Sequence, residues 1–147
     1  MDIKEKIGQM IFSRPRAKDI EKNVRDGIIG GLYVSPDFDM ELIKELKHSR
    51  NIPLIIAADL ECGELSGCSG WPCAMAAARS GERGVYEWAK AQAAEARAVG
   101  VDAVFGPVFD VAFTREGIAT GYRPLGETPE EVARLGFALC WFCRRPL

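Results

Sequence analysis

Two aspartates lie at the ends of short apolar runs in the chain. Asp59 comes directly after the run 54–58, and Asp110 lies shortly after the run 101–105. Apolar runs of this length, bounded by glycine, proline and polar residues, are typical of buried strands. A carboxylate at the carboxyl end of a parallel strand is well placed for ligand binding, both in β/α barrels and in open α/β sheets.

The other residue types that commonly carry chemistry are poorly arranged for it. The single histidine, His48, follows a charged helical run, which indicates a solvated surface residue and argues against histidine-based triads and metal sites. A structural zinc site requires two close ligand pairs, and only Cys140 and Cys143 have the C-x-x-C spacing. We therefore expect no metal and no cofactor, and free thiols at the five cysteines: Cys62, Cys68, Cys73, Cys140 and Cys143.

Composition narrows the class of protein further. A chain of 147 residues with 48% hydrophobic and 27% charged residues fits one globular domain. Its formal charge of -2 argues against nucleic-acid and membrane-surface partners. Because the charged start, 1–6, lacks the apolar core of a signal peptide, we expect a cytoplasmic protein.

The aspartates must be positioned by the elements around them, and these alternate along the chain. Helical periodicity covers 3–11, 19–26, 39–49, 84–99 and 128–139, and apolar runs at 28–34, 54–58 and 101–105 predict strands, with a weaker one near 10–13. For the last helix, Thr128 is the predicted N-cap and Glu131 the partner residue of a capping box. Strands that alternate with helices at this spacing predict βαβ units and a parallel sheet.

Two architectures share this pattern, an open doubly wound sheet and a β/α barrel. The chain lacks both glycine-rich phosphate-loop motifs that are common in open sheets. Strand-end aspartates suit either architecture, so the pattern alone leaves both open. A complete barrel needs about 250 residues, so a barrel would be present here only in part.

Six collinear segments between residues 5 and 130 carry a more specific signal. They are EKIGQM at 5–10, GIIGGL at 27–32, IPLIIAADLECG at 52–63, WPCAMA at 71–76, GVDAVFGPVFDV at 100–111 and RPLGETPE at 123–130. In order and spacing they resemble the N-terminal barrel domain of glycoside hydrolase family 3, whose members include β-glucosidases and β-N-acetylhexosaminidases. The resemblance covers about residues 5–139 and implies that 1–147 is the front portion, the first half of the strands and helices, of a parallel (β/α)8 TIM barrel.

The resemblance also implies a function and roles for individual residues. The family consists of retaining β-glycosidases, which pair a carboxylate nucleophile with a general acid/base. Asp59 and Arg123 match residues that bind sugar hydroxyls, as expected from a carboxylate that accepts hydrogen bonds and a guanidinium that donates several. The resemblance also places Asp110 in the substrate-binding set, as a residue that fixes a loop at the floor of the site, and Glu61 has a structural role in this interpretation.

The chain also departs from the family pattern. Cys62 and Glu64 stand where the family has glycine and arginine, and the arginine of some hexosaminidases falls near Gly67, which weakens the hexosaminide assignment. The family's acid/base and nucleophile lie on later strands, and nothing after Arg123 matches them, so no catalytic residue is assigned. We expect a truncated glycosidase domain that is inactive alone; the alternative is a non-catalytic module that binds saccharides or self-associates through the unclosed barrel edge.

Overall fold

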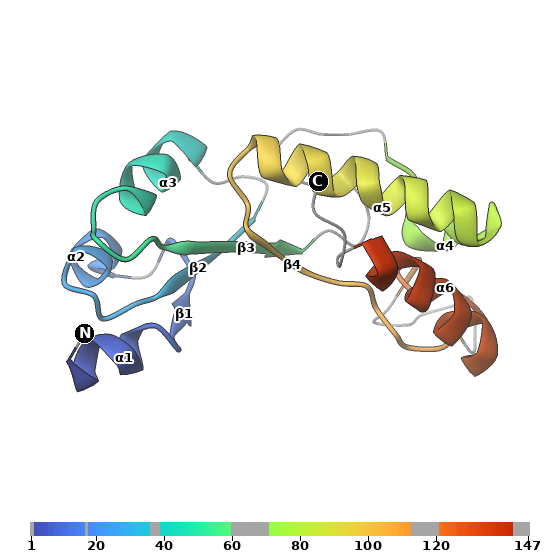
Figure 1. The fold of residues 1–147 in the computed structure, drawn as a ribbon, viewed down its shortest axis with the longest axis horizontal. Coiled ribbons are helices and arrows are strands. Elements are labelled where there is room, and N and C mark those ends of the chain that lie inside the picture. Colours follow the sequence, from blue (N-terminus) through green and yellow to red (C-terminus); the bar gives the residue numbers. More distant parts are fainter. Residues whose placement is uncertain (1, 17, 36–38, 60–70, 113–120, 143–147) are drawn as a thin grey trace. The chain divides into compact units, whose positions relative to one another are not determined.

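The computed structural model describes residues 2–16, 18–35, 39–59, 71–112 and 121–142. The helices are α1 (Ile3–Gly8), α2 (Ile20–Arg25), α3 (Met40–Lys47), α4 (Ala74–Ala78), α5 (Gly81–Ala98) and α6 (Pro129–Phe142); the strands are β1 (Phe12–Ser13), β2 (Gly31–Val34), β3 (Ile55–Asp59) and β4 (Ala103–Phe105) (Figure 1). The chain divides into two compact units, Met1–Asp59 with Ala96–Val104, and Leu60–Glu95 with Phe105–Leu147.

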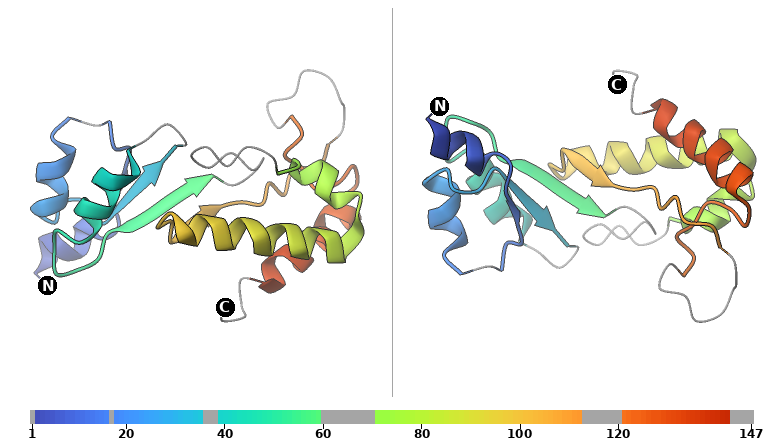
Figure 2. Two further views of the ribbon diagram at one scale, coloured as in Figure 1. Left: turned by 90° about the horizontal axis from the view of Figure 1, so that it is seen from above. Right: turned by 90° about the horizontal axis from the view of Figure 1, so that it is seen from below.

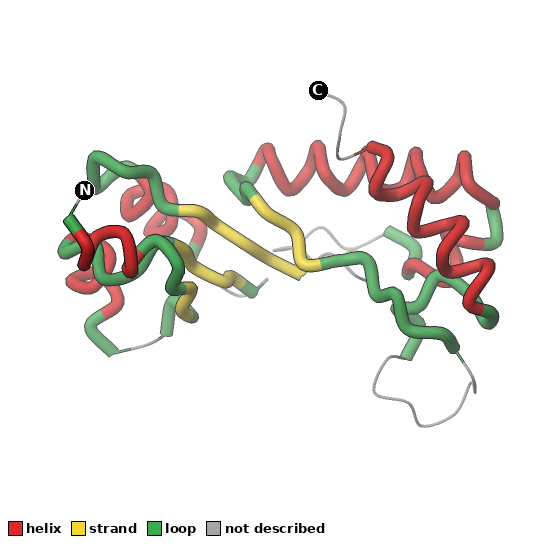
Figure 3. The backbone as a smooth tube through the Cα atoms, turned by 60° about the horizontal axis from the view of Figure 1, so that its bottom comes forward, coloured by secondary structure: helices red, strands yellow, loops and turns green. Residues whose placement is uncertain are grey.

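The sheet follows the chain order. Within the described residues it has four strands in the order β1-β2-β3-β4, so β1 and β4 are its edges (Figure 3). Strand β2 pairs in parallel with β1 and with β3, and the β2–β3 register runs from Gly31 opposite Ile55 to Val34 opposite Ala58. Figure 2 shows β2 and β3 side by side from two further directions. The predicted βαβ organisation and parallel pairing are confirmed for these strands.

Close backbone contacts hold α1 against the start of β2. A Cβ built on Gly8 would lie 2.0 Å from the carbonyl oxygen of Gly27, and one on Gly30 would lie 2.4 Å from the Cα of Gln9. These contacts explain why glycines stand in the segments 5–10 and 27–32, because any larger residue would push the two backbones apart. Helix α1 begins with the capping box that Asp2 and Glu5 form.

A polar clamp ties β3 to the residues before β4. The carboxylate of Asp102 accepts the backbone N–H of Ile56 at 2.9 Å, and its other oxygen meets Lys47 Nζ at 2.6 Å. Lys47 also donates to the carbonyl of Gly100 at 3.1 Å. The Asp102 side chain thus takes the place of a backbone acceptor where the sheet ladder is incomplete.

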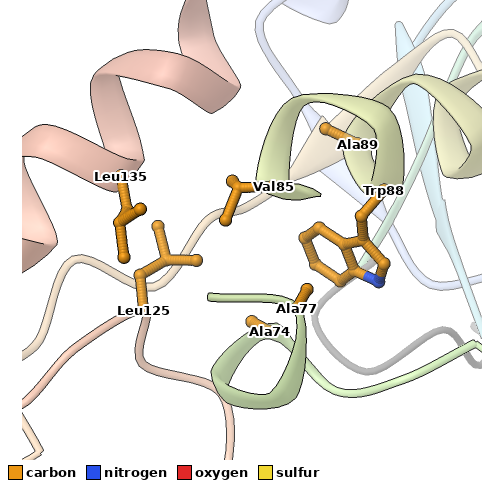
Figure 4. Packing of buried hydrophobic residues seen from close by; sticks show 7 residues of the cluster. All are labelled: Ala74, Ala77, Val85, Trp88, Ala89, Leu125 and Leu135. Atoms are coloured by element: carbon orange, nitrogen blue, oxygen red, sulfur yellow. The ribbon is translucent and has the colours of Figure 1, made fainter. Parts of the chain in front are cut away.

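The second unit is held by an apolar cluster. Trp88 is 7% exposed and packs with Val85, Leu125 and Leu135, while its indole Nε1 donates to the carbonyl of Pro72 at 2.9 Å. Figure 4 shows side chains of α4, α5, α6 and the segment before α6 converging. The cluster consists of Ala74, Ala77, Val85, Trp88, Ala89, Leu125 and Leu135.

Several predicted boundaries differ from the observed ones. The strand predicted over 28–34 begins only at Gly31, because the N–H of Ile28 bonds to the carbonyl of Asn23 and closes the end of α2 instead. Helix α4 lies in a region predicted as loop, and α5 begins at Gly81 rather than Gly84. Five residues rich in alanine are too few to show helical periodicity in a sequence.

The start of α6 is as predicted in most respects. The hydroxyl of Thr128 accepts the N–H of Glu131 at 3.2 Å, which confirms Thr128 as the N-cap. The carboxylate of Glu131 accepts the N–H of Glu127 at 3.0 Å, one residue before the N–H of the usual capping box. Of the helices in the described ranges, none has the length and hydrophobicity required to span a membrane.

Candidate functional site

Asp59 is the last residue of β3 and is exposed at the carboxyl end of that strand. The Tyr33 hydroxyl donates a hydrogen bond to Asp59 Oδ2 from the neighbouring strand β2. The guanidinium of Arg14, directly after β1, stacks over the Tyr33 ring at 5.5 Å from its centroid. Three neighbouring strand ends therefore bring a carboxylate, a phenol and a guanidinium together in the first unit.

Sequence reasoning identified Asp59 but missed Tyr33 and Arg14. Tyr33 lies within an apolar strand pattern, where a tyrosine is equally well explained as a strand former. The usable signal was its position: Tyr33 pairs with Ala57, and Asp59 lies two residues further along β3 on the same face of the sheet. Arg14 gave no comparable signal, because it follows a strand of only two residues.

Asp110 and Arg123 lie in the second unit, on segments that run side by side. A parallel bridge joins Val108 to Pro124, and the N–H of Ala112 donates to the carbonyl of Gly126 at 3.0 Å. These backbone contacts bring the residues immediately around Asp110 and Arg123 into register. Arg123 is half-buried and Asp110 is exposed.

Backbone and apolar contacts hold the loop around Asp110. Its carboxylate makes no hydrogen bond or ion pair with another described residue, so it is open to solvent. The ring of Phe109 packs on α6 at Gly136, where a Cβ would lie 2.2 Å from a ring carbon. Two contacts therefore fix the backbone beside Asp110: the bridge between Val108 and Pro124, and the packing of Phe109 on α6.

The predicted site residues thus lie in two separate groups. Asp59 stands with Tyr33 and Arg14 in the first unit, and Asp110 stands near Arg123 in the second.

The remaining candidates are placed as follows. His48 is exposed at the C-cap of α3, as expected for a solvated residue. Cys73 is a free thiol and Cys140 is exposed on α6, whereas Glu61, Cys62, Cys68 and Cys143 lie outside the described residues. In the part of the chain that the structure describes, no cluster of histidine, cysteine, aspartate or glutamate is arranged to hold a metal.

Comparison with known proteins gives a consistent result. The sequence profile of the glycosyl hydrolase family 3 N terminal domain matches residues 2–140. The chain is 38% identical over 123 residues to a β-hexosaminidase of Methylococcus capsulatus (77% of this chain, 36% of that protein). It is 37% identical over 106 residues to a β-hexosaminidase of Thioalkalivibrio sulfidiphilus (65% of this chain, 30% of that protein). The chain therefore spans about a third of the length of these relatives.

Solved structures extend the comparison to the fold. A glycoside hydrolase family 3 β-N-acetylglucosaminidase from Paenibacillus sp. FPU-7 superposes with a TM-score of 0.82 at 29% identity, covering 97% of this chain and 31% of that one. The choice between an open sheet and a barrel is thereby decided, and the predicted partial TIM barrel is confirmed. With a profile match that runs along nearly the whole chain, this protein belongs to glycosyl hydrolase family 3, as part of its N-terminal barrel domain.

Proposed function

We propose that this chain forms the sugar-binding part of a retaining β-glycosidase site. The observation that carries the proposal is the exposed carboxylate of Asp59 at the carboxyl end of β3, within a chain that matches the family over residues 2–140. In β/α barrels, ligands bind at this end of the strands. The second group, Asp110 and Arg123, adds a carboxylate and a guanidinium on adjacent segments.

The roles of these groups follow from their hydrogen-bonding capacity. Asp59 accepts hydrogen bonds from sugar hydroxyls, and Arg123 donates to sugar oxygens in a fixed planar geometry. Asp110 projects from a loop fixed by backbone contacts and contributes a second acceptor. A retaining glycosidase also requires a nucleophile and an acid/base separated by about 5 Å. We assign neither role to this chain, so we propose saccharide binding without turnover by the chain alone.

For the sugar, we propose a β-N-acetylhexosaminide in first place and a β-glucoside in second place. The two curated relatives are named β-hexosaminidase, and the structural relative is a β-N-acetylglucosaminidase. Glu64 stands where the family motif has arginine, and the arginine of some hexosaminidases falls near Gly67, which is the reason to test both sugars.

Calorimetric titration of the full chain with N-acetylglucosamine and with methyl β-glucoside tests this function. We expect measurable binding that weakens in Asp59→Asn and in Arg123→Lys, with Lys90→Ala on the exposed face of α5 as the control. Turnover of aryl β-glycosides by the chain should be absent. No binding of either sugar would refute the binding role, and turnover that disappears in Asp59→Asn would refute the division between binding and catalysis.

A second candidate, self-association, is favoured by one observation. Helix α1 and the turn after it leave apolar side chains exposed: Ile3 is 69% exposed and Ile7 53%, and Met10 in the turn is 83% exposed. Large apolar side chains that recur at helical spacing on one face commonly mark an interaction surface. Sedimentation of the chain over a concentration series should show dimers or larger species, and Ile7→Glu should return it to the monomer. A monomer at all concentrations would exclude this candidate.

A further inference from the structure

The contact between Tyr33 and Asp59 leaves the two carboxylate oxygens in different situations. Tyr33 Oη donates to Asp59 Oδ2. Asp59 Oδ1 has no hydrogen-bond partner among the described residues, and the side chain is exposed. One oxygen is therefore held from β2, while the other remains free to accept a hydrogen bond from a ligand.

This contact adds little to the pairing of the strands. Strands β2 and β3 are already joined at four register positions, from Gly31–Ile55 to Val34–Ala58. An exposed side-chain hydrogen bond at the end of such a ladder contributes only a small net stabilisation, because water competes for both partners. Its main effect is to restrict the rotation of the Asp59 side chain.

Arg14 restrains the tyrosine in turn. Its guanidinium lies over the Tyr33 ring at 5.5 Å from the centroid, within the range of a cation–π contact. Arg14 has no carboxylate partner among the described residues, and its guanidinium contacts the Tyr33 ring instead. Three side chains from consecutive strand ends thus form one connected set.

We infer that Tyr33 is a positioning residue for Asp59, and that Arg14 stabilises the Tyr33 ring in the orientation required. Tyr33 orients the Asp59 carboxylate so that Oδ1 faces the ligand side, and it spares the ligand the cost of fixing that side chain on binding. This inference rests on the proposed saccharide-binding role of Asp59. It gives a positioning role to two residues that the sequence motifs did not include.

The test combines sugar binding with a direct probe of the Asp59 carboxylate. Tyr33→Phe should weaken N-acetylglucosamine binding by about fivefold, because the ligand must then immobilise the Asp59 side chain itself. Tyr33→Phe combined with Asp59→Asn should bind no more weakly than Asp59→Asn alone, because Tyr33 acts only through Asp59. Arg14→Ala should weaken binding by about threefold, with recovery in Arg14→Lys. Tyr86→Phe and Lys18→Ala serve as matched controls, and the unfolding midpoint of Tyr33→Phe should equal that of the wild type.

The second readout does not depend on sugar binding. In 13C-labelled protein, the Asp59 carboxyl resonance, identified by its absence in Asp59→Asn, should shift in Tyr33→Phe and remain in place in Tyr86→Phe. An unshifted resonance would overturn the inference, as would additive losses in the double variant. If the resonance shifts while the wild type binds no sugar, the positioning contact stands and the proposed function fails.

Discussion

The two units of the chain differ in the contacts that supplement their buried apolar side chains. In the first unit, α1 approaches β2 through glycines, and the Asp102 carboxylate completes the ladder beside β3. In the second unit, Trp88 and Leu125 anchor a continuous apolar cluster. The first unit also buries large apolar side chains, including Leu32, Leu46 and Ile56, so it depends on filled volume as well as on exact backbone spacing and polar pairing. An added side chain should therefore be most costly at the glycine contacts of the first unit.

The largest effect is expected from an added side chain at the closest backbone contact. Gly8→Val should lower the free energy of unfolding by about 3 kcal/mol, because its Cβ would lie 2.0 Å from the Gly27 carbonyl oxygen and the backbone would have to shift. Denaturant unfolding followed by circular dichroism measures the change. Lys4→Ala on the exposed side of α1 is the control. A Gly8→Val protein as stable as the wild type would contradict the close packing of α1.

Removing volume should be costly in the apolar cluster of the second unit. Leu125 is 1% exposed, and Leu125→Ala should lower the free energy of unfolding by about 3 kcal/mol by leaving a cavity among Val85, Trp88 and Leu135. Hydrogen exchange would show where protection is lost. We expect the loss first in α5 and α6; equal loss in β2 and β3 would show that the two units unfold as one.

Two substitutions of Asp102 separate the contribution of its charge from that of its hydrogen bond in the polar clamp. Asp102→Ala leaves the N–H of Ile56 and the ammonium of Lys47 without this partner, and should lower the free energy of unfolding by about 2 kcal/mol. Asp102→Asn keeps an acceptor for Ile56, and should cost about 1 kcal/mol because the ion pair is partly exposed. Thermal unfolding of both variants distinguishes these values; equal losses would mean that the acceptor role is unimportant.

The smallest effect is expected at the N-terminus of α6. Thr128→Ala removes the acceptor of the Glu131 N–H and should cost about 1 kcal/mol. Thr128→Ser retains the hydroxyl and should restore most of the stability. If serine fails to restore it, the Thr128 methyl group rather than the cap is responsible.

Much of the fold was predictable because its signals are local. The apolar run 54–58 corresponds closely to β3, and the Thr128–Glu131 pattern placed the start of α6 correctly. The signals that failed were short or ambiguous. The apolar residues at 28–30 resembled a strand although Ile28 closes the end of α2, and α4 has too few residues to display a period.

The candidate site was also predictable only in part from the sequence. Asp59, Asp110 and Arg123 were identified because each follows a strand or occupies a segment that resembles the family. Tyr33 and Arg14 were not, because their relevance depends on the β2–β3 register and on the end of a two-residue strand. The Tyr33–Asp59 hydrogen bond joins residues 26 positions apart, and Arg14 lies over the Tyr33 ring. Neither contact can be predicted from the spacing of residues along the sequence.

By itself, the sequence determined the alternation of helices and strands and the strand-end carboxylate of Asp59, since both follow from local periodicity and residue type. The tertiary structure decided which oxygen of that carboxylate is held and which is free. It also decided that α1 uses its glycine for packing while Ile3 and Ile7 remain exposed. The physical reason is that an amphipathic pattern predicts a helix with an apolar face, whereas only packing selects the surface of the helix that contacts a neighbour.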